Sequence, residues 1–108
     1  MNIRYTPPAS LVRALDSAFL KALADPARQK IICILVQSGG LDVTGISQYL
    51  TQERSVVSRH LKVLHEAQIV TSEKVGRQVI YSLNGENVIN HVECLLGEFR
   101  KVVGKCCS

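Results

Sequence analysis

Apolar side chains recur every three or four residues in five stretches of the chain, which is the spacing of an amphipathic helix. The predicted helices span residues 9–24, 26–37, 43–50, 54–66 and 85–103. Asp25 before Pro26 predicts an N-cap and first turn for the second helix, and Asn84 predicts the cap of the last one. The second helix is apolar almost all round, so we expect it in the core, with Cys33 as a small buried side chain.

Residues 69–75 and 78–83 are rich in β-branched side chains and predict two strands, joined by a short turn at Gly76-Arg77. Two short helices around a tight turn, followed at once by a hairpin, describe a winged helix-turn-helix. The expected fold is therefore mainly α with a β-hairpin wing. At 108 residues the chain should be a single domain, with residues 1–8 as a flexible arm and 104–108 as a cysteine-bearing tail.

Composition adds expectations about partners and location. Hydrophobic residues make up 46% of this short chain, more aliphatic surface than a small monomer readily buries, which favours a dimer. The net charge of +4 suits a polyanion such as DNA. The longest apolar run, 31–36, is six residues long, far short of the roughly 20 that a membrane helix requires. Residues 1–10 lack the apolar segment of a signal peptide, so we expect a cytoplasmic protein.

The predicted helix 54–66 has two chemically different faces. Val57, Leu61 and Leu64 share one side and form its expected packing face. Short hydroxyls and long cations share the other side. This suits a recognition helix in a major groove, because arginine pairs with guanine edges and serine is a small donor or acceptor. The amides at the helix start can also take a phosphate. The candidate DNA contacts in this helix are Arg54, Ser55, Val56, Ser58, Arg59, His60 and Lys62.

Each of these assignments has a plainer alternative. The basic face could be an ordinary solvated surface; Val56 could be merely exposed instead of touching a thymine methyl, and His60 could be packed instead of reaching a phosphate. Lys74, Arg77 and Gln78 cluster at the predicted hairpin tip. There a wing would lie along the minor groove or the phosphates, whereas the same residues also suit an ordinary soluble turn.

Three segments resemble the ArsR/SmtB family of repressors: residues 19–28 (FLKALADPAR), 57–64 (VSRHLKVL) and 76–83 (GRQVIYSL). The resemblance runs in matching order over about residues 15–95. It implies a homodimer joined through the first and last helices. It also implies that this dimer represses a metal- or metalloid-resistance operon and leaves its double-stranded operator DNA when an inducer binds.

The same resemblance directs attention to the sensing residues, and two of the family's sites are missing. One arsenic site places cysteines at the start of the third helix, where this chain reads LDVTGI at residues 41–46. A zinc-type site uses carboxylates and histidines along the last helix, where His91 is the only histidine and the aligned ligand pairs are broken. What remains is Cys106-Cys107 in the tail, with Cys94 earlier in the last helix.

Adjacent cysteines form a strained disulfide but a good chelate for a thiophilic ion. Trivalent arsenic is satisfied by three thiolates. If Cys94 joins Cys106 and Cys107, the site suits arsenite or antimonite; if the pair binds alone, one valence remains for the organic group of a methylated or other organic trivalent arsenical. The expected inducer is therefore a trivalent arsenical, and no cofactor is required.

The alternatives differ in what the thiols do. A thiol-redox or persulfide sensor would pair Cys33 with a last-helix cysteine, a zinc or cadmium sensor would bind another ion, and an incidental tail would sense nothing. A thiol oxidoreductase is disfavoured because Cys106-Cys107 follows a helix end, where the dipole disfavours a thiolate. With no catalytic Ser/His/Asp pattern or glycine-rich phosphate loop either, we expect no enzyme. An interaction module that dimerises without DNA is the remaining class.

Overall fold

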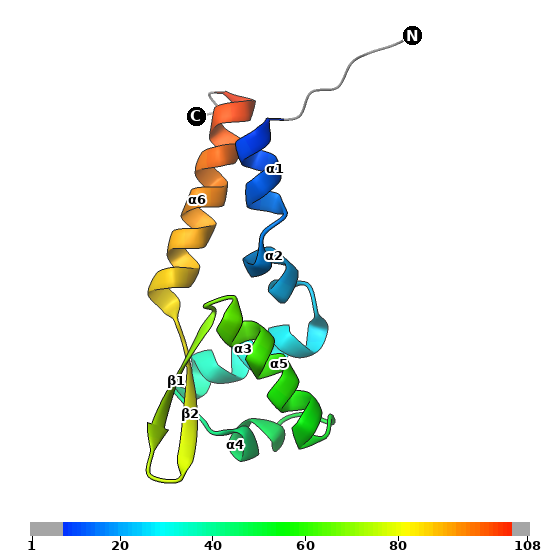
Figure 1. The fold of residues 1–108 in the computed structure, drawn as a ribbon, viewed down its shortest axis with the longest axis vertical. Coiled ribbons are helices and arrows are strands. Elements are labelled where there is room, and N and C mark those ends of the chain that lie inside the picture. Colours follow the sequence, from blue (N-terminus) through cyan, green and yellow to red (C-terminus); the bar gives the residue numbers. More distant parts are fainter. Residues whose placement is uncertain (1–7, 105–108) are drawn as a thin grey trace.

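The computed structural model describes residues 8–104 and is mainly α-helical with one antiparallel hairpin. The elements in chain order are α1 (Ala9–Leu15), α2 (Ala18–Leu23), α3 (Pro26–Ser38), α4 (Val43–Ser47), α5 (Arg54–Glu66), β1 (Val70–Val75), β2 (Gln78–Leu83) and α6 (Gly85–Val103). α3, α4, α5 and the hairpin form one end of the molecule, and α1 packs along α6 at the other end (Figure 1). This arrangement confirms the predicted winged helix-turn-helix.

The prediction of a single first helix is wrong, because residues 9–24 form two helices, α1 and α2. The Ser17 hydroxyl accepts the backbone N–H of Leu20 at 3.1 Å and so caps a new helix. Asp16 ends α1 and forms an exposed ion pair with Lys21 at 2.9 Å. Serine and aspartate compete with the helical backbone for hydrogen bonds, which interrupts the helix although the apolar spacing continues.

α3 is covered on one side only, which corrects the expectation that it lies wholly in the core. Ile31 and Leu35 are buried against α2, α4, α5 and β2, whereas Val36 is exposed. Gly39 ends the helix with a φ of 87°, in the left-handed region that glycine adopts without strain. Cys33 is a surface thiol in this subunit, not the buried side chain we expected.

α4 and α5 are the two helices of the helix-turn-helix. α4 ends at Ser47 and not at Leu50 as predicted. The backbone N–H of Tyr49 donates to the carbonyl of Ile46 at 3.0 Å, and that of Leu50 donates to Ser47 at 3.2 Å, so the chain tightens into a turn. α5 has the predicted bounds, Arg54–Glu66.

α5 ends in a Schellman motif built on a residue other than glycine. The backbone N–H of Gln68 donates to the carbonyl of His65 at 3.0 Å, and that of Ile69 donates to Leu64 at 2.9 Å. Gln68 has a φ of 62°, the left-handed conformation that this motif requires. Ile69 therefore belongs to the helix end, and β1 begins one residue later than predicted, at Val70.

The hairpin has the predicted two-residue turn at Gly76-Arg77, with the two strands paired along their whole length. Gly76 has a φ of 64° at the first central position, which fits a type II′ turn. The linker before α4 adds one isolated bridge to β2: the backbone N–H and carbonyl groups of Leu41 and Tyr81 exchange bonds of 3.0 and 2.8 Å.

The hydrophobic core lies in the half of the molecule that holds the helix-turn-helix. It consists of Phe19, Ala22, Ile31, Leu35, Ile46, Val57, Leu61, Leu64, Ala67, Ile69 and Val70. α1 and α6 contribute no buried residue. They are joined by a hydrogen bond from Ser10 Oγ to Glu98 Oε1 at 2.7 Å, and His91 of α6 stacks on Phe19 of α2 with a centroid separation of 4.7 Å. Within residues 8–104, none of the helices combines the length and apolar character needed to cross a membrane.

Candidate nucleic-acid interface

α5 has the two faces that the helical pattern predicted. Val57, Leu61 and Leu64 are each 0% exposed and hold the helix against the core. The side chains exposed away from this face include those of Ser55, Ser58, Arg59 and Lys62, and Arg54 is exposed in the first turn. Because the buried face fixes the rotation of α5, these hydroxyls and cations are presented to solvent together.

The start of α5 is open to an external acceptor. The backbone N–H groups of Val56 and Val57 both donate to the carbonyl of Glu53 at 3.0 Å, so the first turn is regular. The Glu53 side chain, at the N-cap position, makes no capping bond. The first amides of the helix therefore have no side-chain cap at this position, and a phosphate oxygen is a suitable partner for them.

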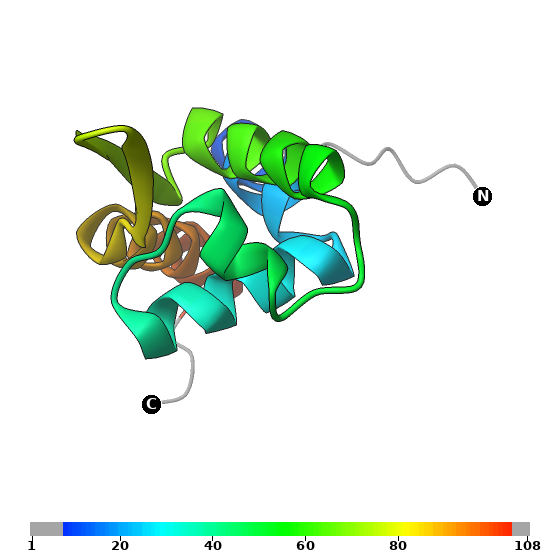
Figure 2. The ribbon, with the colours of Figure 1, turned by 90° about the horizontal axis from the view of Figure 1, so that it is seen from below.

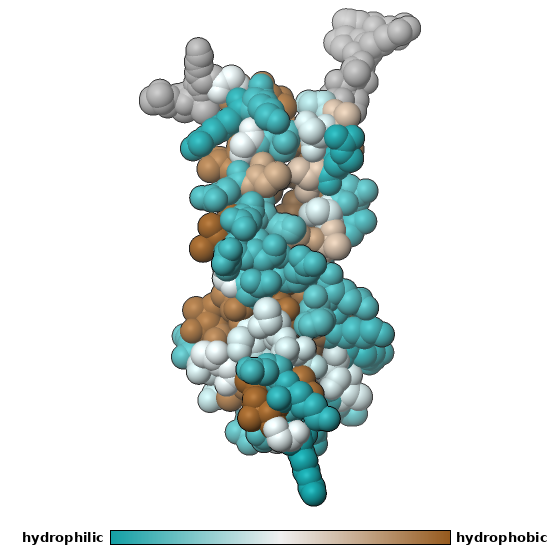
Figure 3. Space-filling model, turned by 60° about the vertical axis from the view of Figure 1, so that its left-hand side comes forward, coloured by the Kyte–Doolittle hydropathy of each residue, from teal (hydrophilic) through white to brown (hydrophobic). Residues whose placement is uncertain are grey.

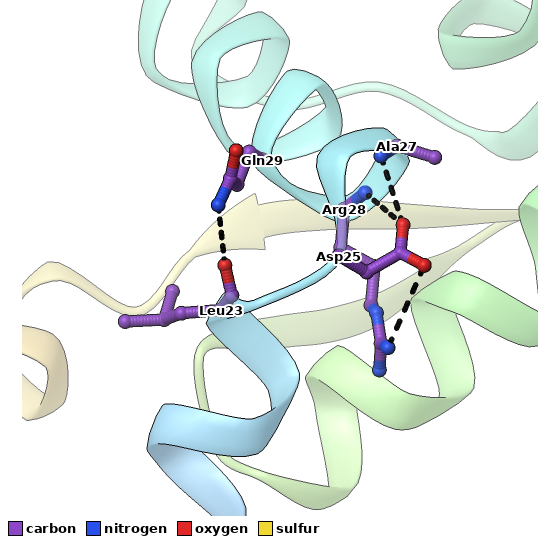
Figure 4. A network of polar contacts seen from close by, with 5 residues as sticks. All are labelled: Leu23, Asp25, Ala27, Arg28 and Gln29. Atoms are coloured by element: carbon purple, nitrogen blue, oxygen red, sulfur yellow. Dashed lines mark hydrogen bonds and ion pairs between the residues drawn. The ribbon is translucent and has the colours of Figure 1, made fainter.

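The corner between α2 and α3 lies close to the half-buried His60 of α5. Asp25 Oδ1 accepts the backbone N–H groups of Ala27 at 2.8 Å and Arg28 at 3.2 Å, and Oδ2 lies 3.8 Å from Arg28 Nη2 (Figure 4). The bond from the Arg28 backbone is the main cause that lowers the pKa of Asp25, and the charge of His60 also contributes. His60 is thus half-buried at the edge of the exposed face.

Lys74 and Arg77 are exposed at the hairpin tip, at the same end of the molecule as the start of α5 (Figures 1 and 2). Gln78 is also exposed, but its Nε2 donates to Asp42 Oδ2 at 3.0 Å. The structure therefore brings the two cations together with α5 on one end of the molecule, while the amide of Gln78 is directed to the linker before α4. Contact of any of these residues with DNA stays a prediction.

Of the predicted thiol ligands, the structure describes only Cys94. Cys106 and Cys107 lie outside the described residues. Cys94 is exposed on α6 and borders a pocket of about 200 Å³ between α6 and the α1–α2 segment. The other lining residues are Ala14, Ser17, Phe19, Leu20, His91 and Leu95. Within residues 8–104, no three His, Cys, Asp or Glu side chains are grouped so that they could hold a metal ion.

Two polar contacts that join the helix-turn-helix to the hairpin were missed in the sequence. One is the bond between Asp42 and Gln78; the other links Ser72 Oγ and His65 Nε2 at 3.2 Å. Aspartate directly before Val43 does signal a helix N-cap. Nothing in the local pattern indicates that its second oxygen has a partner in the hairpin.

Known proteins that resemble this chain are bacterial transcriptional regulators. The sequence model described as bacterial regulatory protein, arsR family, matches residues 25–72, from the cap of α3 to the start of β1. The chain is 35% identical over 103 residues to the arsenical resistance operon repressor of Bacillus subtilis (strain 168), covering 92% of this chain and 95% of that protein. It is 36% identical over 92 residues to the HTH-type transcriptional regulator NmtR of Mycobacterium tuberculosis, covering 85% of this chain and 72% of NmtR. A crystal structure described as a possible transcriptional regulator for arsenical resistance is 28% identical, with a TM-score of 0.67 and coverage of 84% of this chain and 98% of that one.

Proposed function

The chain belongs to the arsR family of bacterial regulatory proteins, DNA-binding transcriptional regulators and not enzymes, and we propose that it is a homodimeric repressor of a metalloid-resistance operon. In this proposal α5 reads the operator, and trivalent arsenic bound by thiolates of α6 and the tail releases the protein. The observation that carries the proposal is the exposed basic face of α5 at the same end of the molecule as the basic hairpin tip.

Operator binding would use both α5 and the hairpin tip. Arg59 can pair with a guanine edge in the major groove, while Ser58 is small enough to let the helix approach the base pairs. Lys74 and Arg77 would follow the phosphates or the minor groove. In a two-fold dimer, the two copies of α5 would enter successive major grooves about 34–36 Å apart on a symmetric operator.

The apolar surface of α1 and α6 supports the dimer. Val12 and Leu15 of α1 and Val92 and Phe99 of α6 are large apolar side chains that the subunit leaves exposed. Apolar side chains interrupt the hydrophilic surface along the half of the molecule that these helices form (Figure 3). Exposed apolar patches of this kind mark interaction surfaces, and an identical second copy offers the same helices in return.

The proposed inducer follows from the thiols and from the relative named as an arsenical resistance operon repressor. Cys106 and Cys107 would chelate trivalent arsenic, and the exposed Cys94 would supply a third thiolate. Binding would tie the tail to α6, shift α6 in the dimer interface and change the spacing of the two copies of α5. A coupling free energy of about 1–3 kcal/mol would weaken operator binding about 5–150-fold. The protein would act in the cytoplasm, where its operator lies.

Operator binding is tested with Arg59→Gln/Lys62→Gln. Arg13→Gln/Lys101→Gln, on α1 and α6 at the far end of the molecule, removes the same charge and is the matched control, used after size-exclusion chromatography shows that both variants have the wild-type oligomeric state. Binding of labelled promoter DNA is measured by fluorescence anisotropy at several salt concentrations. We expect the α5 variant to lose affinity and to show a salt slope smaller by about one for each phosphate that it no longer neutralises. Unchanged affinity and salt slope in the α5 variant would refute the proposed DNA contacts.

The inducer is identified by release of promoter DNA with arsenite, methylated trivalent arsenic, antimonite, zinc, cadmium and peroxide. Cys106→Ser/Cys107→Ser should abolish release by arsenicals, and Cys33→Ser is the matched control that should retain it. Loss of the arsenite response in Cys94→Ser, with the response to the organic arsenical kept, would show that three thiolates hold the inorganic form. Normal release by arsenicals from the double variant would contradict the proposed sensor.

A second candidate is a thiol-redox or persulfide-responsive repressor of the same family. It is favoured by Cys33, which is exposed instead of buried, as is Cys94. Exposed thiols are open to oxidation when their thiolates form. Mass spectrometry of the intact protein after persulfide or disulfide donors, compared with arsenicals, separates the two candidates. Release of DNA by peroxide alone would favour the redox sensor, and release by zinc or cadmium alone would identify a metal-ion sensor.

A further inference from the structure

Both oxygens of the Asp42 carboxylate are engaged, one by each half of the DNA-binding unit. Oδ1 accepts the backbone N–H of Gly45 at 2.9 Å and so caps α4. Oδ2 accepts Nε2 of Gln78, the first residue of β2, at 3.0 Å. Asp42 thus joins the start of the helix-turn-helix to the hairpin directly behind its turn.

The linker before α4 runs closely along β2, which keeps these two groups within reach. Leu41 and Tyr81 exchange two backbone hydrogen bonds. Gly40 lies so close to β2 that an added Cβ would meet Ser82 Oγ at 2.9 Å. Alternate residues of a strand share one face, and this places Gln78 on the same face of β2 as Ser82. The linker therefore contacts β2 at Ser82, Tyr81 and Gln78, and the contact made by Asp42 is the one nearest the turn.

We propose that Asp42 is a positioning residue for operator binding, through Gln78. Gln78 directly follows Arg77 of the turn, and Lys74 is close by on β1. A two-stranded hairpin is marginally stable by itself and twists easily, so its tip needs an anchor to hold a set distance from α5. Among the described residues, the Asp42–Gln78 bond is the side-chain tie nearest to that tip. It fixes where the two cations lie when α5 is in the groove.

This inference rests on the proposed operator binding and gives Gln78 a different part from a direct DNA contact. Its amide donates to a carboxylate, and hydrogen bonds to charged groups are stronger than bonds between neutral ones. Gln78→Glu would replace that donor with a second carboxylate about 3 Å from the first, so the two groups would repel. Asp42→Asn keeps an oxygen for the α4 cap and adds an amide, which can bond to either a turned glutamine or a glutamate at position 78.

The test is a four-member cycle: wild type, Gln78→Glu, Asp42→Asn and the double variant Asp42→Asn/Gln78→Glu. Operator affinity is measured by anisotropy, and hydroxyl-radical footprints report protection by the hairpin separately from protection by α5. We expect Gln78→Glu to bind about three- to tenfold more weakly, with hairpin protection disappearing first. Asp42→Asn should bind like the wild type. The double variant, which has the wild-type net charge, should recover affinity and footprint.

The outcomes separate this inference from the proposed function. Recovery in the double variant together with wild-type affinity of Asp42→Asn supports positioning by Asp42. If Asp42→Asn alone binds more tightly than the wild type by the factor that the double variant recovers, the recovery comes from the lost negative charge, and positioning by Asp42 is refuted. If the double variant stays as weak as Gln78→Glu, the loss comes from a negative charge beside DNA, and positioning by Asp42 is refuted. Wild-type binding by Gln78→Glu refutes it as well. If the wild type itself does not bind its promoter, operator binding fails and the inference fails with it.

Discussion

Replacing Gln68 by glycine should stabilise the protein. Gln68 is the only residue other than glycine with a positive φ, 62°, among the described residues. It holds this conformation because the Schellman motif needs it, and because the adjoining Ile69 packs fully buried together with Leu64. The side chain of Gln68 is exposed, and its carbonyl, which accepts Asn87 Nδ2 at 2.9 Å, is backbone that glycine retains.

The expected gain is the difference between two effects. A left-handed conformation costs an L-residue about 1–2 kcal/mol, which glycine would not incur. Glycine also gives the unfolded chain more freedom, which costs about 0.4–1 kcal/mol of stability. The free energy of unfolding should therefore rise by about 0.5–1 kcal/mol. For a domain of this size, that raises the melting temperature by about 2–8 °C.

Urea denaturation at one fixed protein concentration measures this change, since a dimer's stability depends on concentration. Gln68→Ala is the matched control, because it removes the side chain but keeps the Cβ and should give no comparable gain. Gly39→Ala reverses the experiment: its φ is 87° with no atom near the added Cβ, so any loss of stability comes from the backbone. Equal stabilities for the glycine and alanine variants at position 68 would refute the argument from backbone strain.

Three further predictions concern packing, capping and pH. Leu61→Ala, at a 0% exposed core position, should lower the free energy of unfolding by about 2–5 kcal/mol in urea titrations; a loss below about 1 kcal/mol would contradict the burial of α5. Ser17→Ala should lose the cap of α2 and about 1 kcal/mol by the same assay, whereas Ser17→Asp should keep most of it. The Ser10 hydroxyl is the main cause that holds the pKa of Glu98 below its ordinary value of 4.5, so Ser10→Ala should raise that pKa in an NMR titration. A carboxyl group with a lowered pKa stabilises the folded state at pH values above its ordinary pKa, and this contribution is lost as the pH falls through the lowered value. The pH-dependent part of the stability that Ser10→Ala loses should therefore be present at pH 7 and absent in strong acid.

The features that follow from strong local patterns could be predicted from the sequence. The spacing of Val57, Leu61 and Leu64 fixed which side of α5 is buried, and the glycine turn indicated the hairpin. The break between α1 and α2 could not be predicted from apolar spacing, because it depends on whether the Ser17 hydroxyl or the continuing helix satisfies the backbone. Cys33 was misjudged because an all-apolar helix gives no information about which of its sides the rest of the chain covers.

The candidate site also has one part that could be predicted from the sequence and one that could not. The exposed basic face of α5 follows from the spacing of residues along a single helix, so it could be predicted. The bond between Asp42 and Gln78 joins residues 36 positions apart and depends on how the linker lies along β2. No single-sequence pattern records such a contact, although each residue alone has a recognisable local role.

The absence of any buried residue in α1 and α6 has a consequence for gene control. If these helices complete their packing only against a second copy, the number of chains in the cell determines how many can occupy an operator. When pairs are scarce, doubling the chains would raise the number of pairs about fourfold by mass action. Modest changes in synthesis or degradation would then be amplified at the promoter, even with no inducer present.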